Sequence, residues 1–194
     1  MISLALTVLL AAGVAESAER PNVLFLMSDD HGWQAISAYG RPDGVRLNHT
    51  PSIDRLAHEG RRFDTFFVEN SICAPSRAAF LSGCFSTRHG VPTNAEVFDG
   101  NQPTWPAILQ ANGYRTGVIG KWHLKSDPVG FDKWNVLVGQ GPYYNPPFKH
   151  RDGTTIIDGY TTDIITRLGV ETLRGLVGEQ HKDGKPFALL IQHK

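Results

Sequence analysis

Two short, uninterrupted apolar runs constrain the fold of this chain more than any other feature. They cover residues 23–27 and 186–191, and each is followed directly by polar residues. A continuous apolar run of this length is typical of a strand that is buried on both faces of a parallel sheet. A third strand is predicted at residues 116–120, just before Lys121. The sequence therefore predicts an α/β fold with a largely parallel sheet between helices.

Helix signals lie between the predicted strands. Thr50 is suited to an N-cap and Pro51 to the first helical position, so a helix is expected to begin there and to end near Gly60. The remaining predicted elements are helices at residues 104–113 and 161–177, a strand at 63–68 and an irregular glycine- and proline-rich region at 124–159. Ligands of such sheets bind beyond the carboxyl ends of the strands, so we expect the functional residues at that edge.

Composition limits the size of the protein and the class of its partner. The chain has 194 residues, and its 19 Lys and Arg residues equal its 19 Asp and Glu residues. This length suits one domain with a sizeable core. A zero net charge argues against a nucleic-acid partner that is bound through a broad basic face. It leaves room for a local anion pocket, because a few convergent cations suffice to bind one small anion.

The N-terminal segment is typical of an export signal. Residues 2–14 are nearly all apolar or small, and the small residues around Ala15 and Ser17 suit a cleavage site. We therefore expect a signal peptide at residues 1–18 and an exported protein, either periplasmic or extracellular. No lysine or arginine precedes the apolar run, and a short membrane anchor or a buried first helix are the alternatives. We expect no membrane span, because a spanning helix needs ~20 apolar residues.

Charged and imidazole side chains follow the predicted strands. Asp29 and Asp30 end the first strand, Lys121 and His123 follow residues 116–120, and His193 follows the last strand. Two adjacent carboxylates beside a buried strand are costly unless a cation offsets them, and oxygen ligands suit calcium or magnesium; a solvated turn is the alternative. On an extended segment, Lys121 and His123 would face the same side. The alternative is a solvated lysine beside a histidine with a structural role.

The segment from Cys73 to Arg77 combines a potential nucleophile with an anion-binding group. Pro75 fixes the backbone, and Ser76 and Arg77 begin a predicted helix whose N-terminal dipole faces the cysteine. The guanidinium of Arg77 stays charged and offers forked donors to an oxyanion. Taken alone, an unpaired cysteine is more often an inert structural thiol than a reactive one.

Three segments together resemble the signatures of the type I sulfatases. The segment from Cys73 to Arg77, followed by an apolar helix that Gly83 closes, is similar to their C-x-P-S-R motif. Residues 21–32 are similar to their first strand with its aspartate pair, and residues 120–124 to their second signature. The resemblance implies an alkaline-phosphatase-like α/β fold and hydrolysis of sulfuric esters. Within the family, bacterial N-acetylglucosamine-6-sulfatase-like and mucin-desulfating enzymes are the most similar, which implies a sulfated glycan as substrate.

The resemblance also implies a role for each candidate residue. Cys73 would be oxidised to formylglycine by a formylglycine-generating enzyme or by a cysteine-type sulfatase-maturing enzyme. Calcium would be held by Asp29, Asp30 and the formylglycine diol at position 73. The other implied roles are that Arg77 holds the formylglycine and neutralises developing charge, Lys121 binds the sulfate oxygens, His123 contacts the formylglycine hydroxyl, and His193 contacts the sulfate. For His193 the alternative is that the key histidine of a fuller motif follows Lys194.

The resemblance covers residues 21–194, which correspond to the N-terminal part of the family's catalytic domain. The remaining calcium ligands and a second lysine belong to a later region in the family, so we expect a truncated chain with an incomplete metal site. Two other functions are consistent with these residues. A phosphatase or phosphonate hydrolase of the alkaline phosphatase superfamily would carry serine or threonine at the position of Cys73. A non-catalytic, exported glycan-binding fragment is the second alternative.

Overall fold

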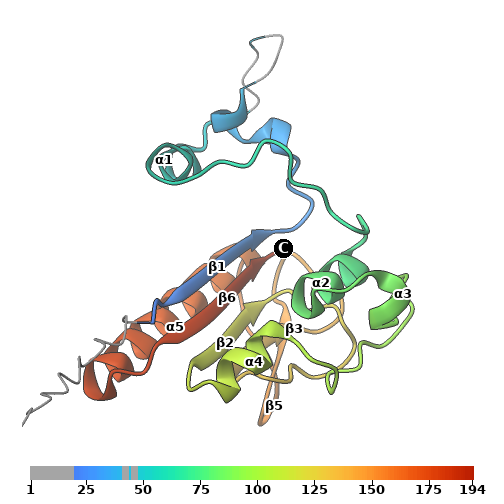
Figure 1. Ribbon diagram of the computed structural model, residues 1–194, viewed down its shortest axis with the longest axis vertical. Coiled ribbons are helices and arrows are strands. Elements are labelled where there is room, and N and C mark those ends of the chain that lie inside the picture. Colours follow the sequence, from blue (N-terminus) through green and yellow to red (C-terminus); the bar gives the residue numbers. More distant parts are fainter. Residues whose placement is uncertain (1–19, 41–43, 45–47) are drawn as a thin grey trace, which may run out of the picture.

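The computed structural model describes residues 20–40, 44 and 48–194, and within them the chain forms a six-stranded sheet (Figure 1). The strands are β1 (Val23–Ser28), β2 (Arg115–Gly120), β3 (Lys133–Leu137), β4 (Pro147–His150), β5 (Gly153–Ile156) and β6 (Phe187–His193). Their order in the sheet is β1-β6-β2-β3-β4-β5. The first four strands are parallel to one another, β4 is antiparallel to β3, and β5 is antiparallel to β4. The expected signal peptide at residues 1–18 lies outside the described residues.

The register of β1, β6 and β2 places their carboxyl ends side by side. Ser28 at the end of β1 pairs with His193 at the end of β6, and Gly120 at the end of β2 pairs with Gln192. The residues that follow β1 and β2, and the last residues of β6, therefore meet at one edge of the sheet. This arrangement confirms the α/β fold with a largely parallel sheet that the continuous apolar runs predict.

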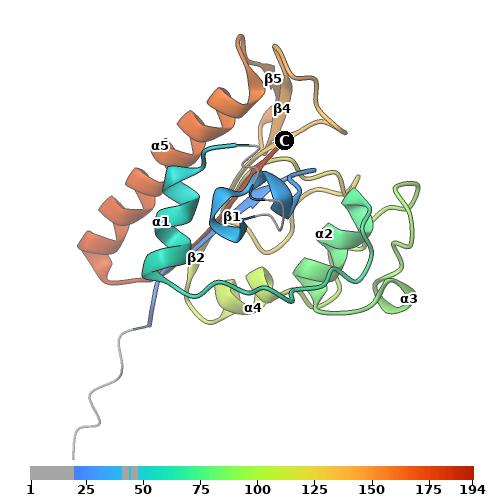
Figure 2. The same ribbon diagram turned by 90° about the horizontal axis from the view of Figure 1, so that it is seen from above.

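Helices cover the two faces of the sheet, as Figure 2 shows. The helix α5 (Thr161–Asp183) packs against β6 and β2 on one face, where Ile165, Leu176 and Leu189 are fully buried. The helices α2 (Cys73–Ser82) and α4 (Trp105–Ala111) lie on the opposite face, and α3 (Ser86–His89) packs against α2. The edge of the sheet at the carboxyl ends of β6 and β2 is thus supported by a packed core on both faces.

The strand β1 is covered on only one face within the described residues. Phe25 stacks on Phe80 of α2 with ring centroids 4.2 Å apart. Leu24 and Leu26, which point to the other face, are about half exposed. The helix α1 (Pro51–Glu59) packs on the short 3-10 turn η2 (Ser37–Tyr39) and lies apart from the sheet (Figure 1). A second 3-10 turn, η1 (Trp33–Ala35), precedes η2.

Three sequence-based expectations about secondary structure were wrong. Residues 63–68 form no strand, because this apolar segment has no partner strand and leaves Phe66 and Phe67 more than four-fifths exposed. Residues 124–159 are not a structureless loop, since they contain β3, β4 and β5. These strands are short and lie near glycines, so the sequence pattern did not predict them. The helix α2 begins at Cys73 rather than at Ser76.

Candidate active site at the carboxyl ends of the strands

Arg77 is the central residue of the candidate site. Its side chain is 3% exposed and reaches from α2 to the edge of the sheet. One terminal nitrogen, Nη1, donates to the carbonyl oxygen of Lys121 at 2.7 Å and to the side-chain oxygen of Gln192. The other, Nη2, donates to Oδ1 of Asp29 at 2.9 Å. A guanidinium held in this way by three segments of chain has a fixed position and direction.

Lys121 supplies a second buried cation beside Arg77. Its Nζ atom forms an ion pair with Oδ2 of Asp29 and lies 3.6 Å from the sulfur of Cys73. Burial raises the pKa of the Asp29 carboxyl, but the hydrogen bonds from Lys121 and Arg77 outweigh this effect and hold the pKa below its usual range. Asp29 is therefore ionised at neutral pH. Two cations against one carboxylate leave a net positive charge next to Cys73.

Cys73 is the first residue of α2 and is half-buried. The backbone N–H of Ala74 donates to Oδ1 of Asn94 at 2.9 Å, which anchors this end of the helix to a distant loop. The helix dipole favours negative charge at this end. A group attached at position 73 thus faces the positive end of α2 and the ammonium of Lys121 together.

A cavity of about 670 Å³ opens beside Cys73. Asp29, Asp30 and Trp33 line it from the end of β1, and Cys73 and Arg77 line it from α2. This volume lies in the range of small-ligand sites. Lys121 is not among the lining residues, and it approaches Cys73 from within the fold.

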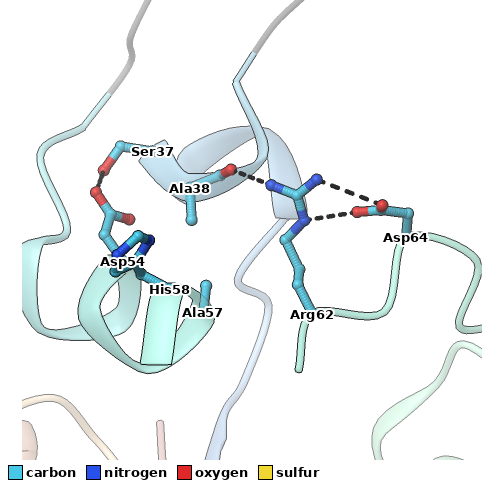
Figure 3. Close-up of a pocket in the computed structure, with 7 residues that line it drawn as sticks. All are labelled: Ser37, Ala38, Asp54, Ala57, His58, Arg62 and Asp64. Atoms are coloured by element: carbon cyan, nitrogen blue, oxygen red, sulfur yellow. Dashed lines mark hydrogen bonds and ion pairs between the residues drawn. The ribbon is translucent and has the colours of Figure 1, made fainter. Parts of the chain in front are cut away.

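A second pocket, of about 490 Å³, lies between η2 and α1 (Figure 3). Most of its charged and polar side chains already have partners in the chain. Ser37 donates to Asp54 at 2.5 Å, and Arg62 binds Asp64 at 2.7 Å and the carbonyl oxygen of Ala38 at 2.6 Å. These mutual bonds hold the turn on the helix and leave little unsatisfied polarity for a ligand.

The structure places His123 and His193 at the same sheet edge as Arg77. Burial, followed by the charges of Lys121 and Arg77, lowers the pKa of His123. Burial alone lowers the pKa of His193. Both imidazoles are therefore neutral at pH 7 and can accept a proton.

The extended geometry expected for Lys121 and His123 was wrong. The strand β2 ends at Gly120, and His123 has a positive φ of 54°. A β-carbon on Gly120, whose φ is 104°, would lie 2.1 Å from the carbonyl oxygen of Gln192. Residue 120 is therefore restricted to glycine, because the end of β2 lies close beside the backbone of β6.

The donor atoms near Cys73 suit a hard cation. The carboxylate of Asp30 is exposed, and Asp29 and Asp30 both line the cavity. Calcium takes six to eight oxygen ligands. Among the described residues, no group of three or more His, Cys, Asp or Glu side chains is placed to hold a metal ion. The carboxylate oxygens of Asp29 and Asp30 are therefore suitable ligands for calcium, but two residues could form only part of its coordination shell.

Sequence reasoning missed two residues that organise this edge, Gln192 and Asn94. Gln192 lies between Ile191 and His193 at the end of an apolar run, and both faces of its strand are buried. No periodicity indicates where such a side chain points. Asn94 lies in a loop far from α2 in the sequence, so no local capping pattern reveals its bond to Ala74.

This arrangement defines an α/β protein with an anion-attracting site at the carboxyl ends of parallel strands. Residues 21–193 match the model of the Sulfatase family. The chain therefore belongs to the sulfatase family, whose members are sulfuric ester hydrolases. The membership confirms the resemblance seen in the sequence motifs.

Named relatives support the same classification. The chain is 45% identical over 183 residues to an N-acetylglucosamine-6-O-sulfatase of Bacteroides thetaiotaomicron, and the match covers 92% of this chain and 31% of that protein. It is 40% identical over 131 residues to arylsulfatase A of Bos taurus, across 64% of this chain and 25% of the relative. The chain thus spans about a third or less of the length of these relatives.

Solved structures share the fold. A protein solved in complex with its substrate D-glucosamine-2-N,6-O-disulfate superposes with a TM-score of 0.81 and 44% identity, over 90% of this chain and 34% of that one. A second structure, solved with a neocarrahexaose, gives a TM-score of 0.79 at 24% identity, over 90% of this chain and 45% of that one. The second likeness concerns the fold alone.

No helix within the described part of the chain is long and apolar enough to cross a membrane.

Proposed function

We propose that the protein to which this chain belongs removes sulfate from a sulfated sugar, with Cys73 as the precursor of its nucleophile. The observation that carries the proposal is the set of contacts around Cys73. The thiol lies 3.6 Å from the ammonium of Lys121, and Arg77 and Lys121 share the single carboxylate of Asp29. The sulfuryl group carries negative charge throughout hydrolysis, so a preorganised positive site beside the nucleophile lowers the barrier.

The proposed cofactors supply two chemical functions. When position 73 carries formylglycine and calcium is bound by Asp29, Asp30 and that residue, the hydrated aldehyde provides an oxygen nucleophile and the metal polarises the sulfate. Either type of maturing enzyme named above would produce the formylglycine. We further propose that residues 1–18 direct export, so that the protein acts in the periplasm or outside the cell.

The chain's own residues position the ester and move protons. We assign Lys121 to binding the sulfate oxygens, and Arg77 to holding the group at position 73 and neutralising developing charge. Their fixed contacts to Asp29 reduce reorganisation during the reaction. His123 is neutral at pH 7, so its imidazole can take a proton from the hydroxyl at position 73. We assign His193 to contact with the substrate, because it ends β6 at the same edge.

The proposed substrate is a glucosamine unit that carries a 6-O-sulfate. This assignment is supported by the relative with 45% identity, which is named an N-acetylglucosamine-6-O-sulfatase. It is also supported by the structural neighbour whose substrate is a glucosamine disulfate. Because the chain spans about a third of that relative, the substrate and the activity are both proposals about the whole protein.

The decisive experiment compares the whole protein produced with and without a maturing enzyme. We expect release of sulfate from 6-O-sulfated glucosamine only after maturation, together with an aldehyde in the peptide that contains position 73, observed by mass spectrometry. Cys73→Ala should abolish turnover without changing the thermal unfolding midpoint by more than a few degrees. Full activity of the plain thiol, or of Cys73→Ala, would refute the assignment. Faster hydrolysis of the matching phosphate ester would instead favour a phosphatase.

A further inference from the structure

Gln192 is a polar side chain buried at the centre of the sheet edge. It lies near the end of β6, where its neighbours in the register are Met27 of β1 and Gly120 of β2, and the residue is 2% exposed. A buried amide without hydrogen-bond partners is destabilising, because nothing offsets the loss of its bonds to water. An apolar residue would satisfy this environment at lower cost, so the presence of an amide calls for a physical reason.

The side-chain oxygen of Gln192 accepts a hydrogen bond from Nη1 of Arg77. The same nitrogen donates to the carbonyl oxygen of Lys121, and Nη2 donates to Asp29. The guanidinium therefore has three acceptors, which come from β6, from the segment after β2 and from the end of β1. Three acceptors on separate segments fix both the position and the plane of the guanidinium.

The charge of the three acceptors differs in a way that matters for anion binding. Only Asp29 is ionised, whereas the carbonyl of Lys121 and the amide of Gln192 are neutral. We propose that Gln192 is a positioning residue, which holds Arg77 in place without cancelling its charge and so keeps the site positive for a sulfate group. The inference rests on the proposed function for its role in turnover, and its structural part is testable alone.

Two nearly isosteric substitutions separate positioning from charge. Gln192→Met keeps the length of the side chain but removes the acceptor, so Arg77 loses one of its three partners. Gln192→Glu keeps an acceptor but adds a second carboxylate to a site that holds two cations. The positioning hypothesis therefore predicts different defects for the two variants, whereas a packing role predicts similar behaviour, because both side chains fill nearly the same volume.

The position of Arg77 can be read directly by nuclear magnetic resonance. Hydrogen exchange of the Arg77 guanidinium protons is measured in the whole protein for the wild type and both variants. We expect Gln192→Met to lose at least tenfold in protection, and Gln192→Glu to retain protection. Equal protection in all three proteins would overturn the inference. This measurement needs no catalytic activity.

Binding of inorganic sulfate, measured by calorimetry, tests the charge argument. We expect Gln192→Glu to bind sulfate at least tenfold more weakly, because an added unit charge a few ångströms from an anion is worth more than 1.4 kcal/mol in a partly buried site. Gln192→Met should stay within about threefold of the wild type, since the charge balance is unchanged. The matched control is Gln180→Glu on α5, which adds the same charge where Gln180 bonds Asn22 and should leave affinity unchanged.

Turnover of the matured protein then separates this inference from the proposed function. We expect Gln192→Met to lose kcat at least tenfold with little change in KM, and Gln192→Glu to raise KM. If the wild type fails to hydrolyse sulfate esters, the proposed function is refuted. Hydrogen exchange of the Arg77 guanidinium and the affinity for inorganic sulfate still decide the role of Gln192. Identical losses of sulfate affinity in Gln192→Met and Gln192→Glu would overturn the inference.

Discussion

Replacing Lys121 by methionine should cost stability in a pH-dependent manner. The Lys121 side chain is 2% exposed, and it pairs with Asp29, whose side chain is 12% exposed. Removing one partner of a buried ion pair costs about 3–5 kcal/mol, but Arg77 remains bound to Asp29, so we expect a loss of about 2 kcal/mol at pH 7. Methionine is close to lysine in length, which preserves most of the packing around the stem.

The sign of the pH dependence follows from the lowered pKa of Asp29. A depressed carboxyl pKa stabilises the fold above the unfolded-state pKa of about 3.9, and this contribution disappears as the pH falls through the folded-state pKa. The stability difference between the wild type and Lys121→Met should therefore be largest at neutral pH. It should shrink once Asp29 becomes protonated in the wild type.

Urea unfolding at neutral and strongly acidic pH measures this difference. Lys125→Met is the matched control, because Lys125 is exposed and, among the residues that the structure describes, donates only to the carbonyl oxygen of Ala95 at 2.7 Å. We expect the control to change stability by less than about 0.5 kcal/mol at either pH. If Lys121→Met loses the same amount at both pH values, the loss comes from packing and the ion-pair argument is wrong.

Three further substitutions test the scaffold and the proposed metal site. Gly120→Ala should cost more than about 3 kcal/mol in urea unfolding, because its β-carbon would lie 2.1 Å from the oxygen of Gln192; a stable variant would refute the close approach. Asn94→Ala should lower stability by about 1 kcal/mol, because the Ala74 N–H loses its acceptor, and an unchanged midpoint would contradict this. Asp30→Asn should weaken calcium binding in calorimetry of the whole protein by at least about tenfold; equal affinity would exclude Asp30 as a ligand.

The sequence predicted the strands β1 and β6, although only β6 is buried on both faces within the described residues. Continuous apolar runs at residues 23–27 and 186–191 leave few alternatives to a strand, and the structure has β1 and β6 there. The short strands β3, β4 and β5 escaped prediction, since their pairing depends on partners rather than on local pattern. The apolar segment at 63–68 shows the converse: composition alone does not make a strand without a neighbour.

The candidate site was predictable as a set of residues but not as a set of contacts. Asp29 and Lys121 follow two parallel strands and His193 ends a third strand between them, so their common edge follows from topology. The contacts of Arg77 depend on the register between β6 and β2 and on which face Gln192 takes. A strand with both faces buried carries no alternation from which that direction could be inferred.

The order of the strands in the sheet has a consequence for folding during translation. The strand β6 comes after β1 and β2 in the sequence, yet it lies between them in the sheet. Until it inserts, β1 and β2 have no shared neighbour, and Arg77 lacks the acceptor that Gln192 provides. Contacts between such distant segments form slowly, because a long loop must close first. On a ribosome, the stretch around Cys73 is therefore expected to stay loosely held until β6 has emerged and paired with β1 and β2.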